Sequence, residues 1–398
     1  NNWAGYTRHF SIPAEWKDKR IKLRCDGIYS QCEVFINGEK VAAHLGGFTA
    51  FETDITNLAK PGQSAVIAVR VKNESVADSL ASGSKYAVHP LGGITRKIQL
   101  IALPEINIGQ LQLLTSFDKN YKDATLTTEM RIRNESRSDS RIALLVELFS
   151  PLNQKKVFSK EISVTDQIST GEQIERKFDF AIANPLKWDA EHPHLYRLKT
   201  TLLRNGKVEE VVEKNVGFRQ IEVRGNRVYV NNFPIKLRGV CRHEVMPLRG
   251  RSVNGNQWEE DVKILRDGNV NYIRTSHYPP AEELIDACDR FGMFLEVEAP
   301  FCWAHQTNVS ADEFIPALQT QTLDMVDFFR SHPSVLIWSM GNESMKYKEY
   351  FRKTAALVKQ LDPSRPRIFS QWGPDADDNE LEIGNHHYPG PGGPAKYA

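Results

Sequence analysis

The pattern of apolar and polar positions divides the chain into three regions. Residues 1–104 contain short runs in which apolar side chains alternate with others, such as Ile21-Lys22-Leu23-Arg24-Cys25. This alternation is typical of half-buried strands, and helical periodicity is nearly absent. Asn37-Gly38 lies between two such runs and predicts a hairpin, because a type I′ turn needs two residues with positive φ. We expect residues 1–104 to form a β-sandwich.

The second region, residues 105–219, is again β. Two long runs, 124–132 and 141–148, are rich in apolar and β-branched residues. A second hairpin is predicted at Asn205-Gly206, between the runs 196–203 and 209–212. A region of about 110 residues with short strands and tight turns favours an immunoglobulin-like β-sandwich.

The third region, residues 220–398, alternates apolar strands with amphipathic helices, the pattern of repeated βα units and a parallel sheet. The predicted strands are Ile235–Val240, Asn271–Ser276, Met293–Val297, Val335–Met340, Arg367–Gln371 and Glu382–Asn385. The predicted helices are Gln257–Asp267, Ala281–Phe291, Phe314–Arg330 and Lys348–Leu361. Six strands predict an incomplete (β/α)8 TIM barrel, because a complete one takes about 250 residues. An open doubly wound sheet is the alternative, but no G-x-G-x-x-G supports a dinucleotide site.

Composition narrows the classes of partner. The 398 residues include 51 Lys and Arg and 50 Asp and Glu, so a net charge of +1 gives no reason to expect a nucleic acid or a membrane surface. No apolar run reaches the 18–20 or so residues that span a bilayer. The five cysteines are scattered without a C-x-x-C pair, which argues against a disulfide framework or a zinc site. A homo-oligomer is compatible with this composition.

The two ends of the chain have unusual sequences. The chain begins Asn1-Asn2-Trp3, without an initiator Met or a signal peptide, and is rich in Pro and Gly over residues 389–394. We expect both ends to be cuts in a longer protein. The sequence does not distinguish a periplasmic or secreted location from a cytoplasmic one.

Polar, acidic and aromatic side chains recur where the predicted parallel strands end. Since catalytic residues of a barrel come from the carboxyl ends of different strands, we expect these segments to meet at one site. The segments are Arg242-His243-Glu244, Arg274-Thr275-Ser276-His277-Tyr278, Glu298-Ala299-Pro300-Phe301-Cys302-Trp303, Gly341-Asn342-Glu343, Trp372-Gly373 and His386-His387-Tyr388. Aromatic rings beside carboxylates and neutral histidines are what a carbohydrate pocket requires, and glycoside hydrolysis needs two carboxyl groups.

These motifs resemble family 2 glycoside hydrolases, which include β-galactosidases, β-glucuronidases and β-mannosidases. The resemblance rests on Gly341-Asn342-Glu343 after an apolar strand, on Arg-Gly-Val-x-Arg-His-Glu from Arg238, and on Arg-x-Ser-His-Tyr-Pro from Arg274. Gly93-Ile94-x-Arg96 matches the family's jelly-roll sugar-binding domain, and Gly217-Phe218-Arg219 closes the part that resembles its immunoglobulin-like domain. The resemblance covers the whole chain.

The resemblance implies roles for several residues. Glu343 would be the general acid/base of retaining hydrolysis of a terminal β-glycosidic bond, and Asn342 would bind the sugar 2-hydroxyl. His243 and His277 would contact sugar hydroxyls, and Tyr388 would lie near the nucleophile. The family's nucleophile follows a seventh strand, so we expect it beyond Ala398 and expect this polypeptide alone to be inactive.

Three further residues at the strand ends are expected to contact substrate. They are Trp303, Trp372 and Glu298, although the tryptophans are equally compatible with core packing and Glu298 with a buried structural carboxylate. Of the adjacent His386 and His387, only one can line the site if they lie in a strand. The predicted activity is β-galactosidase-like. The alternatives are a β-glucuronidase-like hydrolase and a non-catalytic carbohydrate-binding fragment.

No cofactor is expected. Metal-dependent β-galactosidases of the family carry Glu-x-His shortly after the third strand, where this chain reads Phe301-Cys302-Trp303-Ala304-His305. Because the carboxylate is missing, a Mg²⁺ site is not supported. Those enzymes also place an Asp before the Gly-Ile-x-Arg motif, where this chain has no acid over residues 85–90.

Overall fold

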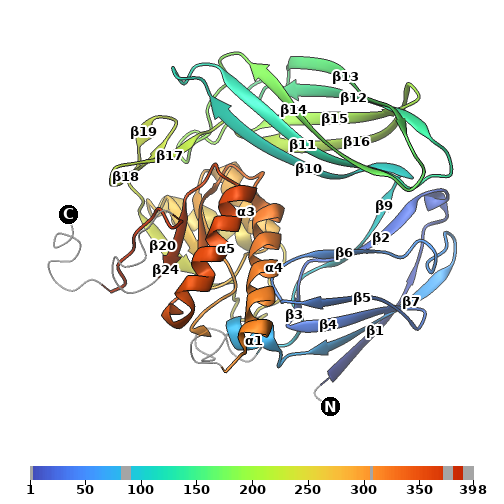
Figure 1. Cartoon of the computed structure of the whole chain (residues 1–398), viewed down its shortest axis with the longest axis horizontal. Coiled ribbons are helices and arrows are strands. Elements are labelled where there is room, and N and C mark those ends of the chain that lie inside the picture. The colour runs from blue at the N-terminus through green and yellow to red at the C-terminus, as the bar shows by residue number, and fades with distance from the viewer. Residues whose placement is uncertain (1–2, 82–90, 305–307, 371–379, 389–398) are drawn as a thin grey trace.

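A computed structural model of the chain describes residues 3–81, 91–304, 308–370 and 380–388. Figure 1 shows three parts: a first β-sandwich, a second β-sandwich and a segment of parallel sheet with helices. The fold class predicted from the sequence is confirmed, including the incomplete barrel. None of the helices among these residues has the length and apolar character needed to cross a membrane.

The first sandwich packs two antiparallel sheets, with strand orders β1-β7-β4-β5 and β6-β2-β9, around one apolar core. A short pair, β3-β8, extends it toward the barrel segment. The elements are β1 (Trp3–Ser11), β2 (Arg20–Cys25), β3 (Ile28–Tyr29), β4 (Gln31–Ile36), β5 (Glu39–Leu45), β6 (Phe51–Asp54), β7 (Ser64–Lys72), α1 (Val76–Ala81), β8 (Gly93–Ile94) and β9 (Ile98–Leu103).

The second sandwich packs the sheets β10-β11-β14 and β13-β12-β15-β16, again antiparallel throughout. Along β11 every second residue is buried, which fills the core from one face of the strand. The strands are β10 (Ile106–Phe117), β11 (Ala124–Asn134), β12 (Ser140–Phe149), β13 (Lys156–Ile168), β14 (Gln173–Ile182), β15 (Tyr196–Arg204) and β16 (Lys207–Val216).

Both predicted Asn-Gly hairpins are confirmed. Asn37 and Gly38 join β4 to β5 with φ of 50° and 87°, and Asn205 and Gly206 join β15 to β16 with φ of 50° and 80°. Asn and Gly accept these left-handed conformations at low cost, so the turns fix the strand pairing locally.

The barrel segment begins after a small antiparallel sheet of β17 (Ile221–Arg224), β18 (Arg227–Val230) and β19 (Phe233–Pro234). Its parallel strands lie in chain order: β20 (Gly239–Arg242), β21 (Tyr272–Thr275), β22 (Phe294–Glu298), β23 (Val335–Asn342) and β24 (Arg367–Ser370). The helices between them are α2 (Gln257–Asp267), α3 (Glu282–Phe291), α4 (Ala311–Phe329) and α5 (Lys348–Leu361), and their apolar faces pack with the sheet into the largest core.

The sixth predicted strand, Glu382–Asn385, does not form. Within Glu382–Asn385 the described structure has an isolated bridge, between Ile368 and Ile383, and no ladder. The side chain of Glu382 accepts the backbone N–H of Arg367 at 3.0 Å and also pairs with the Arg367 guanidinium. A carboxylate therefore occupies the position that a ladder carbonyl would take, and the alternation of apolar residues alone does not produce a strand.

The second sandwich is joined to the barrel segment through buried groups. Arg219 donates from Nε to the carbonyl of Pro333 at 2.7 Å and from Nη2 to that of Val335 at 3.2 Å. Trp188 donates from Nε1 to the carbonyl of Asp289 at 2.9 Å. Gly217 sits so close to Pro333 that a Cβ would lie 2.6 Å from the proline ring, so a larger residue would force the two parts apart.

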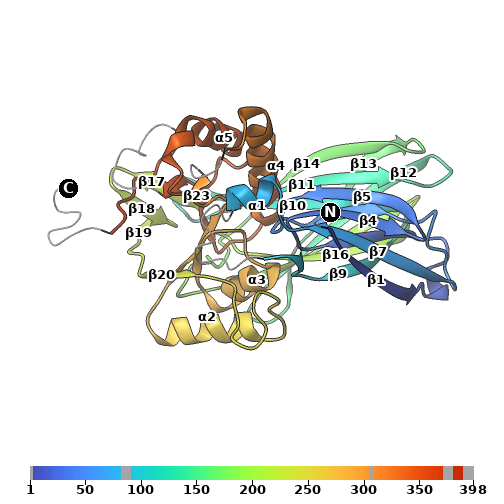
Figure 2. The same cartoon turned by 90° about the horizontal axis from the view of Figure 1, so that it is seen from below.

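The first sandwich reaches the barrel segment through ion pairs and through α1, which lies against α4 in both views (Figures 1 and 2). Arg96 pairs with Glu244 at 3.0 Å, Arg24 pairs with Glu282 at 2.7 Å, and Lys97 pairs with Glu283. The carbonyl of Leu80 in α1 accepts the N–H of Cys302 at 3.0 Å. The loop after β22, which belongs to the barrel segment, is thus also hydrogen-bonded to α1 of the first region.

We expect Arg219→Met to lower the free energy of unfolding by about 1–3 kcal/mol, because it leaves the buried carbonyl of Pro333 without its donor, whereas Arg365 still donates to the carbonyl of Val335. Urea unfolding followed by tryptophan fluorescence measures this. Arg131→Met is the control, since Arg131 forms an ion pair with an exposed carboxylate, Glu175, and should change stability by less than about 1 kcal/mol. Equal effects of the two substitutions would contradict the role of Arg219.

Candidate active site

The carboxyl ends of β20 to β23 bring the predicted site residues to one edge of the parallel sheet. His243 follows β20, His277 follows β21, Glu298 ends β22, and Asn342 and Glu343 stand at the end of β23. Parallel strands end at the same edge, so residues up to 100 apart in sequence become neighbours. The expectation that these segments meet is met for the described residues.

Arg274, within β21, is the centre of this edge. Its guanidinium donates to Glu298 Oε2 through Nη2 at 2.5 Å and through Nε at 2.8 Å. The same Nη2 donates to Asn342 Oδ1 at 2.9 Å, and Nε lies 3.3 Å from Glu296 Oε1. One cation therefore orients residues from β22 and β23 together.

Glu298 has no exposed area and a full set of partners. Besides Arg274, its oxygens accept His277 Nδ1 at 2.7 Å and the Ser339 hydroxyl at 2.7 Å. Burial alone would raise the pKa of Glu298, but Arg274, His277 and Ser339 outweigh it and lower the pKa to about 2. The enclosed carboxylate orients His277 and Arg274, which favours the structural alternative for Glu298, and a contact with substrate stays a prediction.

Glu343 is presented by an irregular strand end. The β23–β24 register shifts between Ser339 and Asn342, and Glu343 has φ of 44°. The preceding Gly341 has φ of 149°, and a Cβ there would meet Phe301 and Phe351 at 3.1 Å. This bulged backbone turns the Glu343 side chain into the site, where it remains 9% exposed.

Three side-chain nitrogens contact the Glu343 carboxylate. Trp303 Nε1 donates to Oε2, and His387 Nδ1 lies 3.0 Å from Oε1. Asn342 Nδ2 is 3.4 Å from Oε2. Burial by itself would raise the pKa of Glu343. The hydrogen bonds from His387 and Trp303 lower the pKa by more than burial raises it, so the pKa lies below its ordinary value. As described, this carboxyl is an anion.

His243 and His277 lie side by side. Their ring centroids are 5.5 Å apart with planes at 82°, and His243 Nδ1 is 3.3 Å from the hydroxyl of Tyr278. Burial, helped by His277 and Arg251, lowers the pKa of His243 to about 4, so the ring is neutral at pH 7. A neutral imidazole offers one donor and one acceptor nitrogen, as binding of a hydroxyl requires.

The remaining predicted residues fall in different places. Trp303 contacts Glu343 as described, with φ of 52°. Tyr388 is 76% exposed, and its ring lies edge-on to that of His387 at 5.8 Å; its expected place near the nucleophile stays a prediction. Trp372 lies outside the described residues.

The sequence left open which of His386 and His387 faces the site, and it did not predict the central position of Arg274. The adjacent pair His386-His387 predicted that one ring faces the site, and only the structure shows that it is His387. Arg274 lies in the Arg-x-Ser-His-Tyr-Pro motif, but its bond to Asn342 depends on non-local packing that the motif does not encode. Arg242 does form an ion pair, with Asp261 at 2.6 Å.

The residues after β22 do not fit a Mg²⁺ site. Cys302 is buried, accepts Asn342 Nδ2 at 3.5 Å, and has a pKa that burial raises to about 12. A protonated thiol is a poor ligand for this hard cation, which prefers carboxylate oxygens. The absence of a metal requirement stays a prediction, and no step below uses a metal.

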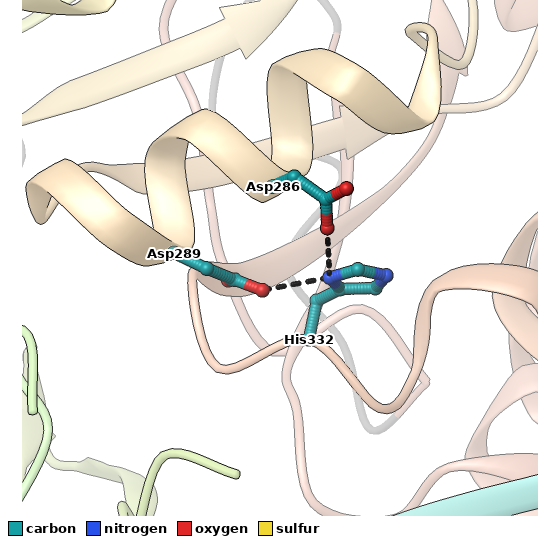
Figure 3. Close-up of side chains that lie close together, drawn as sticks. All are labelled: Asp286, Asp289 and His332. Carbon is teal, nitrogen blue, oxygen red and sulfur yellow. Dashed lines mark hydrogen bonds and ion pairs between the residues drawn. The ribbon is translucent and has the colours of Figure 1, made fainter. Parts of the chain in front are cut away.

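A different group of acidic side chains and a histidine lies away from these strand ends, where α3 meets the loop before β23 (Figure 3). His332 Nδ1 is 2.7 Å from Asp289 Oδ2 and 3.9 Å from Asp286 Oδ1. Burial lowers the pKa of His332, but Asp289 and Asp286 raise it above its ordinary value. A protonated Nδ1 that donates to Asp289 offers no lone pair to a metal, so we interpret this group as a structural ion pair.

Comparison with known proteins identifies the family. Three successive family descriptions match: "Glycosyl hydrolases family 2, sugar binding domain" over residues 1–104, "Glycosyl hydrolases family 2" over 106–219, and "Glycosyl hydrolases family 2, TIM barrel domain" over 221–389. The chain belongs to glycoside hydrolase family 2. The resemblance inferred from the motifs is thereby confirmed.

Relatives within family 2 are similar over most of this chain. A β-galactosidase of Thermoanaerobacter pseudethanolicus is 28% identical over 91% of the chain and 47% of the relative. A β-glucuronidase of Bacteroides fragilis is 29% identical over 91% of the chain and 54% of the relative. A solved family 2 glycosyl hydrolase from Bacteroides cellulosilyticus is 29% identical with a TM-score of 0.80, over 92% of this chain and 50% of that one. The chain thus spans about half the length of each of these three proteins.

The enclosed Glu298 predicts a specific acid response. Its pKa falls from an ordinary 4.5 to about 2 on folding, so its stabilisation is complete above pH 4.5 and is lost as the pH falls toward 2. At pH 7, Glu298→Gln should lower the free energy of unfolding by about 3–5 kcal/mol, because one partner of a buried pair is removed. The difference from wild type should shrink between pH 4.5 and pH 2, measured by urea unfolding at each pH.

Glu175→Gln serves as the control, since Glu175 is 68% exposed at the side chain and pairs with Arg131 on the second sandwich. It should change stability by less than about 1 kcal/mol at every pH. A Glu298→Gln penalty that does not vary with pH would show that Glu298 is not ionised in the folded protein.

Proposed function

We propose that the protein containing this chain hydrolyses terminal β-glycosidic bonds with retention of configuration, with Glu343 as the general acid/base. The observation that carries the proposal is the Glu343 carboxyl: 9% exposed, set on a bulged strand end, and held by Trp303 and His387. Polar groups that recur around it, Asn342 and the two histidines, suit a substrate covered with hydroxyls. Family membership supports the same activity.

The acid step requires a proton on Glu343. Its pKa lies below the ordinary value in the described arrangement, so the site must raise it when substrate binds. A sugar that displaces water, together with a second carboxylate nearby, would do this, because both disfavour the anion. Glu343 would then protonate the leaving oxygen and, as the anion again, accept a proton from water in the second step.

Retention also requires a nucleophilic carboxylate about 5–5.5 Å from Glu343. The carboxylates that share Arg274, Glu296 and Glu298, are 4% and 0% exposed and cannot reach an anomeric carbon. We therefore propose that the nucleophile belongs to a part of the protein outside this sequence. The chain alone is then expected to bind sugar without turning it over.

We propose a β-galactoside as the substrate, with a β-glucuronide as the alternative. The named relatives include enzymes of both kinds, and the described residues carry no feature that is specific for a carboxylate on the sugar. A panel of p-nitrophenyl β-glycosides, tested on the full-length protein, separates the two. Turnover of neither the galactoside nor the glucuronide would contradict the assignment.

Glu343→Gln in the full-length protein should reduce kcat/KM for an alkyl β-glycoside by about 10²–10⁴-fold, because the leaving oxygen is no longer protonated. A dinitrophenyl glycoside, whose leaving group needs no acid, should lose much less in the first step. Glu349→Gln, in α5 with a partner in Arg352, is the control and should leave both rates unchanged. Unchanged alkyl glycoside hydrolysis by Glu343→Gln would refute its role.

A further inference from the structure

The hydroxyl of Tyr278 has three neighbours in the described structure. It accepts the backbone N–H of Glu244 at 2.9 Å and an N–H of the Arg251 guanidinium. Its third neighbour is Nδ1 of His243, at 3.3 Å. A phenol oxygen has two lone pairs and one hydrogen, so two N–H donors occupy both lone pairs.

The phenol hydrogen then has one described acceptor within reach, His243 Nδ1. If Nδ1 accepts, the hydrogen of the neutral imidazole must be on Nε2. The low pKa of His243, about 4, agrees with a ring that stays neutral in this environment. The protonation pattern follows from counting donors and acceptors on one oxygen.

We propose that Tyr278 is a positioning residue that fixes His243 as the Nε2–H tautomer, so that this ring presents a hydrogen-bond donor to an oxygen of the sugar. The part that concerns sugar rests on the proposed function; the tautomer does not. Tyr278 itself is 2% exposed and acts through His243.

The contacts of His277 favour the opposite tautomer, with the hydrogen on Nδ1. Its Nδ1 lies 2.7 Å from Glu298 Oε1, and a carboxylate only accepts, so Nδ1 carries the hydrogen. In the neutral form its Nε2 is an acceptor. Two perpendicular rings 5.5 Å apart thus present a donor and an acceptor, which matches a sugar hydroxyl pair in which one oxygen accepts and one hydroxyl donates.

The first sandwich holds Tyr278 in place. Phe48 stacks on the Tyr278 ring at 4.4 Å and 14°, within a small buried cluster that also contains Tyr29. Arg96 donates to Glu244 Oε2 at 3.0 Å and to the carbonyl of Pro279 at 2.7 Å. Arg96 of the first sandwich thus anchors Glu244, whose N–H donates to Tyr278, and Pro279, which follows Tyr278 in the chain.

Tyr278→Phe tests the proposal because it keeps the ring stacked on Phe48 and removes only the hydroxyl. In ¹⁵N-histidine spectra of the full-length protein, assigned with His243→Gln, wild-type His243 should show a protonated Nε2 and an unprotonated, hydrogen-bonded Nδ1. In Tyr278→Phe, Nδ1 should move toward the shift of an acceptor without a donor. A proton on Nδ1 in the wild type, or an Nδ1 shift identical in both proteins, would overturn the proposal.

Tyr29→Phe is the matched control. Tyr29 belongs to the same buried cluster, and its hydroxyl donates to Asp78 at 2.7 Å. The loss of this hydroxyl removes one buried hydrogen bond, as Tyr278→Phe does, and should leave the shifts of the His243 nitrogens unchanged. A shift of Nδ1 as large in Tyr29→Phe as in Tyr278→Phe would mean that the cluster as a whole, and not the Tyr278 hydroxyl, sets the tautomer.

Calorimetry with two uncleaved probes, phenyl β-thiogalactoside and phenyl β-thioglucuronide, gives a second readout. Tyr278→Phe should weaken the probe that binds by about threefold to tenfold, the loss expected for one misdirected hydrogen bond, while Tyr29→Phe binds as the wild type does. Equal affinity of wild type and Tyr278→Phe would overturn the positioning role. If the wild type binds neither probe, the proposed function fails, and the tautomer is still decided by the spectra.

Discussion

The buried guanidinium of Arg274 is the group on which the candidate site depends. It donates to Glu298 and Asn342 and lies against Glu296, so it ties three neighbouring strands together at their carboxyl ends. A cation taken out of water is stable only when its partners compensate it, and here two carboxylates do so. Because Glu298 in turn holds His277, one ion pair determines where several polar groups of the site lie.

The site is also a product of contacts between domains. Phe48 and Arg96 reach from the first sandwich to Tyr278 and Glu244, directly behind His243. The second sandwich contacts the loop before β23 through Arg219, so it fixes the start of the strand that ends in Asn342. The two sandwiches therefore contribute to the geometry of the strand ends, in addition to any sugar binding of their own.

The sequence was sufficient where structure is local. Asn37-Gly38 makes its turn by itself, and α2 and α5 begin and end at the predicted residues because their apolar periodicity is unambiguous. The prediction from sequence failed where a contact with a distant residue determines the local structure. The segment at Glu382 has the alternation of a strand, but the Glu382 carboxylate binds Arg367 and no ladder forms there. The strand-end motifs located the site, because each motif directly follows a strand that is recognisable from its own sequence. The enclosure of Glu298 and the exposure of Tyr388 depend on packing that no local pattern encodes.

We propose that the edge formed by β20 to β23 is a retaining glycosidase site with Glu343 as its acid/base. A crystal structure of the full-length protein trapped with a 2-deoxy-2-fluoro-β-glycosyl fluoride tests it most directly. We expect a sugar bonded to a second carboxylate about 5–5.5 Å from the Glu343 carboxyl, with His243 and Asn342 in contact with its ring substituents. A sugar bonded to Glu343 itself, or bound away from these strand ends, would contradict it.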